Sequence, residues 1–242
     1  MPERLAVILA AGAGTRLRPR SERVPKCLLE VGGRTLLDYQ LDALARHGIR
    51  DVLVVTGFGA EQITGRYADR IRTVHNPDFE TTNNLHSLWA ARREFSGKDF
   101  LCLHADVLFH PAVLAGCLDS EADACFLLDR ELNQETMKAR LEAGRVVEIS
   151  KSIPREQMGG TFLGVARFAP RSSSALGEIL GALVLDPAHR NSYFTACVPE
   201  LSRRGFNLGC SWTNSLPWIE IDFEGDFGRA EREVLPRIVS AP

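Results

Sequence analysis

The sequence has 242 residues, of which 45% are hydrophobic and 25% charged, and its formal net charge is −2. These values are ordinary for a soluble protein, and they give no reason to expect nucleic acid or an anionic membrane as a partner. No apolar run approaches the roughly 20 residues that span a bilayer, and Met1–Arg4 leads straight into an apolar run without the layout of a signal peptide. The six cysteines form no C-x-x-C pair, which favours free thiols in a reducing compartment. We therefore expect a cytoplasmic protein with one domain over residues 1–242.

Residues 1–122 alternate short apolar runs with helical patterns. Strands are expected at 5–10, 51–56, 71–75 and 100–104. Helices are expected at 35–47, 61–68, 87–94 and 111–118. This alternation predicts an α/β, Rossmann-like sheet that is mixed but mainly parallel, with helices on both faces. Ligands of such sheets bind beyond the carboxyl ends of the strands.

The pattern changes in residues 123–242. Four strand-like runs, at 123–128, 145–149, 161–168 and 207–213, are less regularly separated by helices, which indicates mixed pairing. The charged, turn-rich stretch 129–160 is expected to hold a flap over the site. Further helices are expected at 172–184, at 192–204 with a break or a new start at Pro199, and at 226–235, where Pro236 should end the chain's last helix.

The stretch Leu9–Leu17, directly after the first strand, carries the strongest functional signal. Its glycines, Gly12 and Gly14, let backbone N–H groups approach a triphosphate closely. Arg16 adds donors suited to phosphate oxygens, and Lys26 follows ten residues later. A dinucleotide-binding fingerprint would need a third glycine at position 17, which is Leu, and a Walker A loop would need G-K-[ST]. The plain alternative is an ordinary glycine-containing turn, which the added cations make less favoured.

Two aspartates, Asp106 and Asp222, each follow a strand-like run. Carboxylates at neighbouring strand ends can share one Mg²⁺, although a strand-end aspartate can also serve only as a cap for the next turn or helix. Glu220 lies two residues before Asp222, so its side chain should point the same way in a strand.

The run L-A-A-G-x-G-T-R-L at Leu9–Leu17, with Pro25-Lys26 after it, resembles the signature of sugar-nucleotide pyrophosphorylase-like nucleotidyltransferases. The resemblance implies their nucleotide-diphospho-sugar transferase fold, with a nucleotide-binding half at 1–122 and an acceptor-binding half at 123–242. It implies that the nucleotide is held by Leu9, Ala10, Ala11, Gly12, Gly14, Thr15 and Arg16. It further implies that Lys26 contacts the phosphates, that Asp106 and Asp222 bind Mg²⁺, and that Lys151 meets the acceptor's phosphate.

Fainter signals concern the base and the acceptor. Gly57, in a turn after the second strand, resembles a family position beside the nucleobase, and Asn83, Asn84 and Ser87 offer groups that can read a pyrimidine. An Asn-rich turn before a helix is equally an ordinary N-cap.

The resemblance narrows to phosphocholine and 2-aminoethylphosphonate cytidylyltransferases. It rests on Asn76, Phe79, Asn83, Asn84, Ser87 and Leu88, on 135–138, and on the ending Trp218-x-Glu220-Ile221-Asp222-Phe223. It implies acceptor contacts from Gly164, Tyr193, Trp218 and Glu220 besides Lys151. A quaternary ammonium would call for an aromatic cage, for which Tyr193, Phe194, Trp212 and Trp218 are candidates, although aromatics are more often core.

These observations predict an Mg²⁺-dependent enzyme that transfers CMP from CTP to a small phosphate- or phosphonate-bearing acceptor, such as phosphocholine or 2-aminoethylphosphonate, with release of pyrophosphate. An acceptor oxygen that is already anionic attacks the α-phosphorus and needs no general base. Two alternatives stay open: a sugar-1-phosphate uridylyl- or thymidylyltransferase, and a nucleotide-sensing regulatory subunit. A homodimer is one option for assembly, which the sequence does not decide.

Overall fold

The computed structural model describes residues 4–17, 22–132 and 136–240. Among these residues, nine strands form one mixed sheet, in the order β10-β9-β11-β6-β1-β4-β5, with β8 paired to β11 and β12 paired to β8. The strands of the first half are β1 (Leu5–Ala10), β4 (Asp51–Thr56), β5 (Arg72–His75) and β6 (Phe100–His104). They pair in parallel, in register, with β1 between β4 and β6. The predicted α/β class and all four predicted strands of this half are confirmed.

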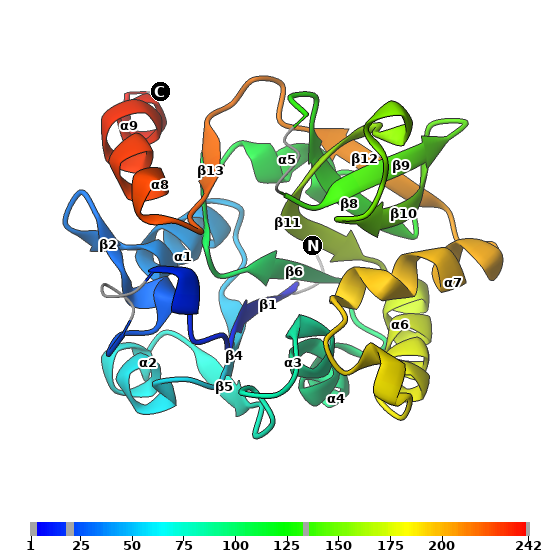
Figure 1. Ribbon diagram of the computed structural model, residues 1–242, viewed down its shortest axis with the longest axis horizontal. Coiled ribbons are helices and arrows are strands. Elements are labelled where there is room, and N and C mark those ends of the chain that lie inside the picture. The colour runs from blue at the N-terminus through cyan, green and yellow to red at the C-terminus, as the bar shows by residue number, and fades with distance from the viewer. Residues whose placement is uncertain (1–3, 18–21, 133–135, 241–242) are drawn as a thin grey trace.

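The second half extends the sheet with mostly antiparallel strands (Figure 1). These are β8 (Ala124–Asp129), β9 (Lys138–Glu142), β10 (Arg145–Ser150), β11 (Gly160–Phe168) and β12 (Leu208–Trp212). Strand β11 runs antiparallel to β6 and so joins the two halves, while β12 is parallel to β8. The stretch expected to be a flap contains a β9–β10 hairpin at the sheet edge. The sequence pattern had not indicated β9.

Two small ribbons lie outside the main sheet. Strands β2 (Glu30–Val31) and β3 (Arg34–Thr35) form one, and β7 (Val107–Phe109) pairs antiparallel with β13 (Trp218–Glu220) in the other. The second ribbon joins residues more than a hundred positions apart in the chain, beside the end of β6. It therefore carries the C-terminal segment back to the carboxyl ends of the parallel strands.

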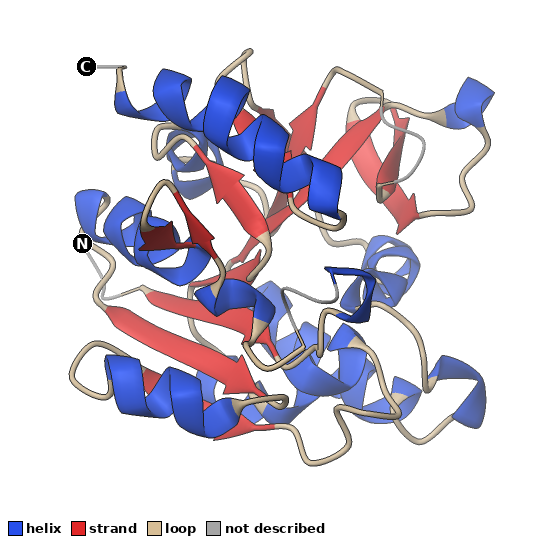
Figure 2. Cartoon of the chain, turned by 60° about the vertical axis from the view of Figure 1, so that its left-hand side comes forward, coloured by secondary structure: helices blue, strands red, loops and turns tan. Residues whose placement is uncertain are grey.

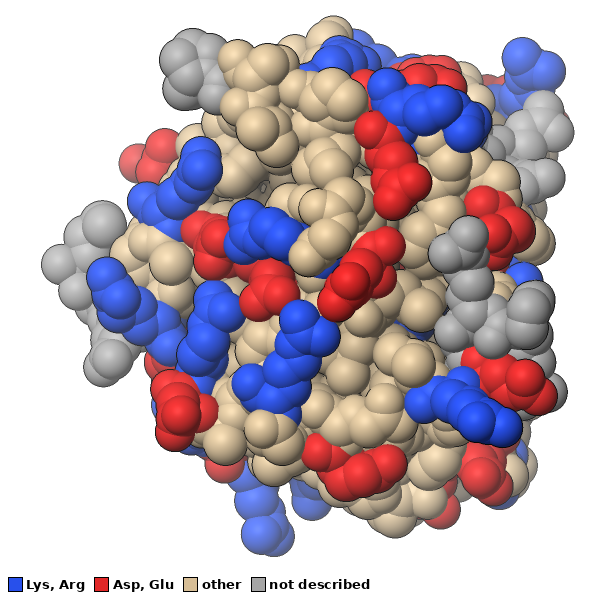
Figure 3. Space-filling view, turned by 90° about the vertical axis from the view of Figure 1, so that its left-hand side faces the viewer, with Lys and Arg blue, Asp and Glu red and all other residues tan. Residues whose placement is uncertain are grey.

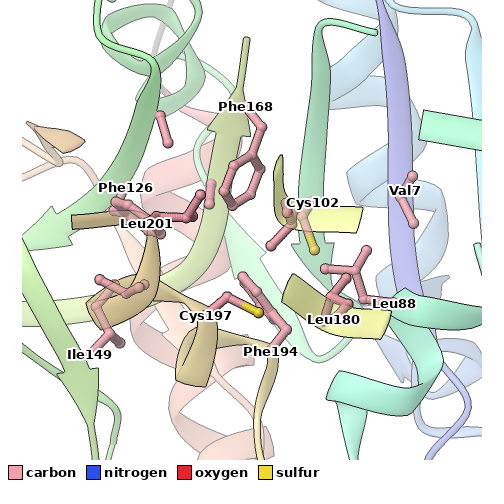
Figure 4. Close-up of a cluster of buried hydrophobic side chains, with 14 of the residues drawn as sticks. Val7, Leu88, Cys102, Phe126, Ile149, Phe168, Leu180, Phe194, Cys197 and Leu201 are labelled. Atoms are coloured by element: carbon pink, nitrogen blue, oxygen red, sulfur yellow. The ribbon is translucent and has the colours of Figure 1, made fainter. Parts of the chain in front are cut away.

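Helices cover both faces of the sheet, as predicted (Figure 2). They are α1 (Leu36–Arg46), α2 (Ala60–Tyr67), α3 (Asn84–Ala90), α4 (Arg92–Phe95), α5 (Val113–Leu118), α6 (Pro170–Leu183), α7 (Val198–Arg203), α8 (Glu224–Arg229) and α9 (Leu235–Val239). Alternate residues of β1 pack on opposite faces of the sheet. Val7 packs in a core with α3, α4, α6 and α7 (Figure 4), whereas Ile8 packs in a core with α1, α2 and α5. Among the described residues, no helix is both long and apolar enough to cross a bilayer.

Three helix predictions need correction. In place of one helix at 87–94, α3 begins earlier, at Asn84, and α4 follows it after a break at Ala91. The last helix does not end at Pro236: α8 passes into a π-helical turn at Ala230–Val234, and α9 continues through the proline. Pro236 lies in the first turn of α9, where a backbone N–H is dispensable, and the π turn changes the hydrogen-bonding register before it. The helix expected at 192–204 is a 3₁₀ turn at Phe194–Cys197 followed by α7, so Pro199 marks a new start.

Charged side chains of both signs mingle on the face that carries α1 and α2 (Figure 3). Ion pairs such as Arg34–Asp42 and Arg70–Asp38 link neighbouring elements there. Exposed pairs of this kind contribute little to stability. Because positive and negative side chains lie next to one another, this face carries no broad surface of one charge.

Gly164 occupies a backbone position that only glycine fits well. Its φ is +80°, it lies where the β11–β8 register shifts, and a Cβ there would lie 2.7 Å from the ring of buried His104. Gly144, in the β9–β10 turn, has a nearly equal φ of +78°, but a Cβ there would meet no atom within 4 Å.

We expect Gly164→Ala to destabilise the fold more than Gly144→Ala. Both variants incur the left-handed backbone cost of about 1–2 kcal/mol, and Gly164→Ala adds an overpacking cost of about 1–3 kcal/mol. Urea unfolding of the two variants measures the difference directly. Equal losses of unfolding free energy would show that His104 moves away without cost.

Candidate active site

A cavity of about 420 Å³ opens at the carboxyl ends of β1 and β6. The loop after β1 forms one wall, contributing Leu9, Ala10, Ala11, Gly12, Ala13, Gly14 and Arg16. Gly12 borders open space, and Gly14 has a φ of +59° that starts a 3₁₀ turn at Thr15–Leu17. Of Thr15 only the backbone is described. The loop therefore presents main chain, with little side-chain bulk, to whatever fills the cavity.

Gly57 lies behind this loop and does not line the cavity. A Cβ at Gly57 would lie 2.6 Å from the Ala11 carbonyl oxygen and 2.6 Å from Cβ of Phe79, and both of these residues are cavity walls. The adjacent Phe58 N–H donates to the Ala11 oxygen at 3.1 Å. Gly57 thus acts as a support that permits close packing of the loop, Phe79 and the turn after β4.

One ammonium group joins the charged residues that the sequence singled out. Nζ of Lys26 donates to Oδ2 of Asp106 at 2.7 Å and to Oδ1 of Asp222 at 2.6 Å. Asp106 connects β6 to β7, and Asp222 follows β13, so the β7–β13 ribbon brings the two carboxylates together. The Ile221 N–H donates to the Asp106 carbonyl oxygen at 2.9 Å and continues this pairing.

The two aspartates set the charge of Lys26. Burial alone lowers the pKa of this ammonium, but Asp106 and Asp222 outweigh burial and raise the pKa above its usual value. Burial by itself would raise the pKa of Asp106, yet the charge and hydrogen bond of Lys26 hold this pKa below its usual range. Arg16 adds a second cation, with Nη2 3.1 Å from Oδ1 of Asp222 and its side chain half exposed. The site is thus a cluster of fixed, opposite charges.

The donor set at Asp106 fits a hard divalent cation. His104, Asp106 and Glu220 each place one ligand atom within 4.8 Å of the others. Oδ1 of Asp106 is buried and has no hydrogen-bond partner among the described residues. Carboxylate oxygens of this kind are typical ligands of Mg²⁺. Asp222 is connected to this group through Lys26.

His104 is a site residue that the sequence pattern had not indicated. It is the last residue of β6, its Nε2 lies 3.2 Å from Nδ2 of Asn84, and burial lowers its pKa, so the ring is neutral. Burial, together with Asp106 and Asp222, raises the pKa of Glu220 to about 8. Both residues therefore add little charge of their own near pH 7. The position of His104 at the end of a strand was the sequence signal that could have identified it.

The Asn-rich segment forms the opposite wall. Asn83 caps α3, since its Oδ1 accepts from the Asn84 N–H at 2.8 Å. Oδ1 of Asn84 accepts from the Phe194 N–H at 2.8 Å, which ties α3 to the second half of the chain. Oγ of Ser87 accepts from Nδ2 of Asn76 at 3.1 Å. Asn83, Asn84 and Ser87 all line the cavity, and the cap that was one interpretation of the segment is present.

The structure places some of the predicted acceptor-binding residues at the cavity and others away from it. Lys151, Tyr193 and Glu220 line the cavity, and Nζ of Lys151 lies 5.6 Å from the Tyr193 ring centre. Gly164 lies behind His104, and Nε1 of Trp218 donates to Asp129 at 2.7 Å, away from the cavity walls. Residue 135, part of the family resemblance, lies outside the described residues.

The aromatic cage considered from the sequence is not assembled around the cavity. Phe194 is buried in the core, and Trp212 stacks under Arg130, whose guanidinium carbon lies 4.2 Å from the ring centre. Trp218 is held by Asp129. Tyr193 alone of the four candidates lines the cavity.

Residues 6–150 match the family described as the MobA-like NTP transferase domain. The chain belongs to this family. Members of a nucleotidyltransferase family share a fold and a site for nucleoside triphosphates, which agrees with the position of the loop after β1.

Individual proteins resemble this MobA-like chain either over part of its length or at low sequence identity. Over 114 residues it is 46% identical to CMP-5'-(3-aminopropyl)phosphonate synthase of Streptomyces rubellomurinus, a match covering 45% of this chain and 18% of that one. It is 24% identical to CTP:phosphoglutamine cytidylyltransferase of Campylobacter jejuni, over 91% of this chain and 96% of that one. The phosphocholine cytidylyltransferase structure of Streptococcus pneumoniae has the same fold, with a TM-score of 0.78, 22% identity and 94% and 98% coverage of the two chains.

We expect Lys26→Met to bind Mn²⁺, a probe for Mg²⁺, more tightly than the wild-type protein when nucleotide is absent. In the wild type a metal ion must compete with an ammonium that already contacts both carboxylates. Removing this cation leaves the partly buried Asp106 without its ion-pair partner and Asp222 with Arg16 alone, so the affinity should rise about tenfold or more. Titration of free Mn²⁺ by electron paramagnetic resonance measures this affinity.

Lys98→Met, at an exposed lysine outside the cavity, is the matched control and should bind Mn²⁺ as the wild type does. Equal or weaker Mn²⁺ binding by Lys26→Met would contradict competition between Lys26 and the metal.

Proposed function

We propose that this protein transfers CMP from CTP to a small acceptor that bears a phosphate or phosphonate group, and releases pyrophosphate. The observation that carries the proposal is the cavity itself. Its walls combine a main-chain loop with Arg16, Lys26 and Asp106, and both cations also contact Asp222. Such a site neutralises and orients phosphates, and it needs no nucleophilic side chain.

Cys27 and His104, which could serve as a nucleophile or a base, are unsuited to these roles by their surroundings. Burial raises the pKa of Cys27, the cysteine lining the cavity, to about 12, so its thiol stays protonated. Burial lowers the pKa of His104, and its Nε2 lies against Asn84. Direct displacement at phosphorus therefore agrees with this site better than a covalent enzyme intermediate does.

The names of relatives support cytidine as the base. A CMP-phosphonate synthase and a CTP:phosphoglutamine cytidylyltransferase resemble this chain, and so does the choline-phosphate cytidylyltransferase fold. Their acceptors differ, but each of the three names contains a phosphonate or a phosphate ester or amide. The shared chemistry is an anionic oxygen on phosphorus, which is the acceptor class that we propose.

In the proposed reaction, an oxygen of the acceptor phosphate or phosphonate forms a bond to the α-phosphorus of CTP. The bond from the α-phosphorus to the oxygen bridging the β-phosphorus breaks, and that oxygen leaves with pyrophosphate. Backbone N–H groups of the loop, Arg16 and Lys26 hold the charged oxygens in line. Lys151, on the opposite wall, neutralises the acceptor.

Asp106 and Asp222 would hold Mg²⁺, with His104 and Glu220 beside Asp106. When bound, Mg²⁺ supplies charge neutralisation at the phosphate oxygens. The Lys26 ammonium uses two of its three N–H donors on the carboxylates, which leaves the third for a phosphate oxygen. Such a contact is within reach because the loop and Lys26 line the same cavity.

The proposed activity predicts pyrophosphate release when the protein is incubated with Mg²⁺, CTP and a suitable acceptor. A panel of 2-aminoethylphosphonate, phosphocholine, inositol phosphate, glycerol phosphate and hexose 1-phosphates, each tested with CTP, UTP and dTTP, covers both transferase classes. CTP should give the highest rate. Higher rates with UTP or dTTP and a hexose 1-phosphate would instead establish a sugar nucleotidyltransferase, and no release with any pair would remove the proposed function.

Asp106→Asn should lower kcat about a hundredfold or more, because charge-stabilising groups of this kind contribute that much to transfer reactions. Asp119→Asn, at an exposed aspartate after α5 that does not line the cavity, is the matched control and should keep its activity. A folded Asp106→Asn variant with wild-type kcat would contradict the role given to Asp106.

A further inference from the structure

A second cavity of about 490 Å³ adjoins the first. The two cavities share Met137, Lys151 and Tyr193 as walls. The remaining walls of the second cavity come from 148–152, at the end of β10, and from 191–199, before and within α7. A volume of this size is typical of a ligand pocket. An acceptor whose phosphorus group lies at Lys151 therefore has a continuous path for its organic end.

The charges along this path are of opposite sign. Lys151 lies at the junction of the two cavities, and Glu148 lies three residues earlier and lines only the second cavity. The Glu148 side chain is 35% exposed, and its Oε2 accepts from Nε of Arg140 at a rather long 3.3 Å. A carboxylate with one long, partly exposed ion pair can accept further hydrogen bonds from a ligand. The path thus leads from a cation to a carboxylate.

The walls favour a head group that forms hydrogen bonds over one that forms none. Ser150, Ser152, Ser192 and Thr195 line the second cavity, and Tyr193 is the aromatic residue among its described walls. A quaternary ammonium has no N–H to donate and is bound by several aromatic faces. A primary ammonium carries three donors, which suit a carboxylate and hydroxyl groups.

We propose that the second cavity receives the organic end of the acceptor, and that Glu148 selects acceptors that end in a primary ammonium group. This inference rests on the proposed function, because it takes the acceptor's phosphorus group to be at Lys151. Glu148 is then a specificity-determining residue on the acceptor side. It has no part in binding CTP, since it does not line the first cavity.

Three phosphonates that differ only in the head group test the inference: 2-aminoethylphosphonate, its N-trimethyl derivative and ethylphosphonate. With CTP, the wild-type kcat/KM for the primary amine should exceed both others by about tenfold or more, the value of one charged hydrogen bond. Glu148→Gln should remove this preference through a higher KM for the amine. The KM for CTP and the activity with ethylphosphonate should stay unchanged.

Glu142→Gln is the matched control. Glu142 lies on the same hairpin and pairs with the same Arg140, but it does not line the cavity. This variant should keep the preference for the amine, and thermal unfolding should show that both variants fold. A loss of preference in Glu142→Gln equal to that in Glu148→Gln would assign the effect to the charge of the hairpin and overturn the inference.

Equal or better use of the trimethyl compound, or an unchanged preference in Glu148→Gln, would also overturn the inference. So would turnover only with acceptors that lack an amine, such as inositol phosphate, and each of these results leaves the proposed function standing. Release of pyrophosphate with no acceptor of the wider panel would remove the proposed function itself.

Discussion

The site depends on one ammonium group held between two carboxylates from distant parts of the chain. Lys26 contacts Asp106 and Asp222 at 2.7 and 2.6 Å. Bringing two like charges to one place is unfavourable without a cation, so Lys26 makes the β7–β13 pairing electrostatically acceptable before any ligand binds. The arrangement has a consequence for chemistry. In the proposed reaction the same cation also meets the phosphates, so the group that holds the unliganded site together is one that the ligands would contact.

The surrounding fold keeps these charges in place from both sides. The parallel strands β1 and β6 position the loop and Asp106, while the antiparallel strand β11 fixes the second half against β6. Asn84 ties α3 to the segment of Tyr193 through the Phe194 N–H. The loop after β1, the carboxylates and the residues Lys151 and Tyr193 thus meet at one cavity, although they come from distant regions of the sequence. This convergence is what the proposed transfer needs, because its two substrates must lie side by side.

The sequence was sufficient for the parallel half because strands buried on both faces, such as Leu5–Ala10, are uniformly apolar, and Gly48 ends the α1 pattern. The sequence was less informative where contacts between distant segments decide the local structure. Strand β9 is short and partly charged, so its local pattern resembled a flap, and Pro236 continues a helix only because a π turn precedes it. Motif residues Gly57 and Gly164 were assigned to ligand contacts, but the structure places both behind the cavity walls, where the absence of a Cβ is what matters. Lys26, Asp106 and Asp222 were each singled out, yet their direct contact could not be read from residues separated by 80 and 196 positions.

The proposed function depends on direct passage of a nucleoside monophosphate to the acceptor at this cavity. Incubation with Mg²⁺, an accepted phosphonate or phosphate and CTP labelled with ³²P at the α-phosphorus tests it directly. The label should appear in a CMP–acceptor conjugate, and the released pyrophosphate should carry none. Label in free CMP alone, or in a covalent adduct of the protein, would contradict direct transfer.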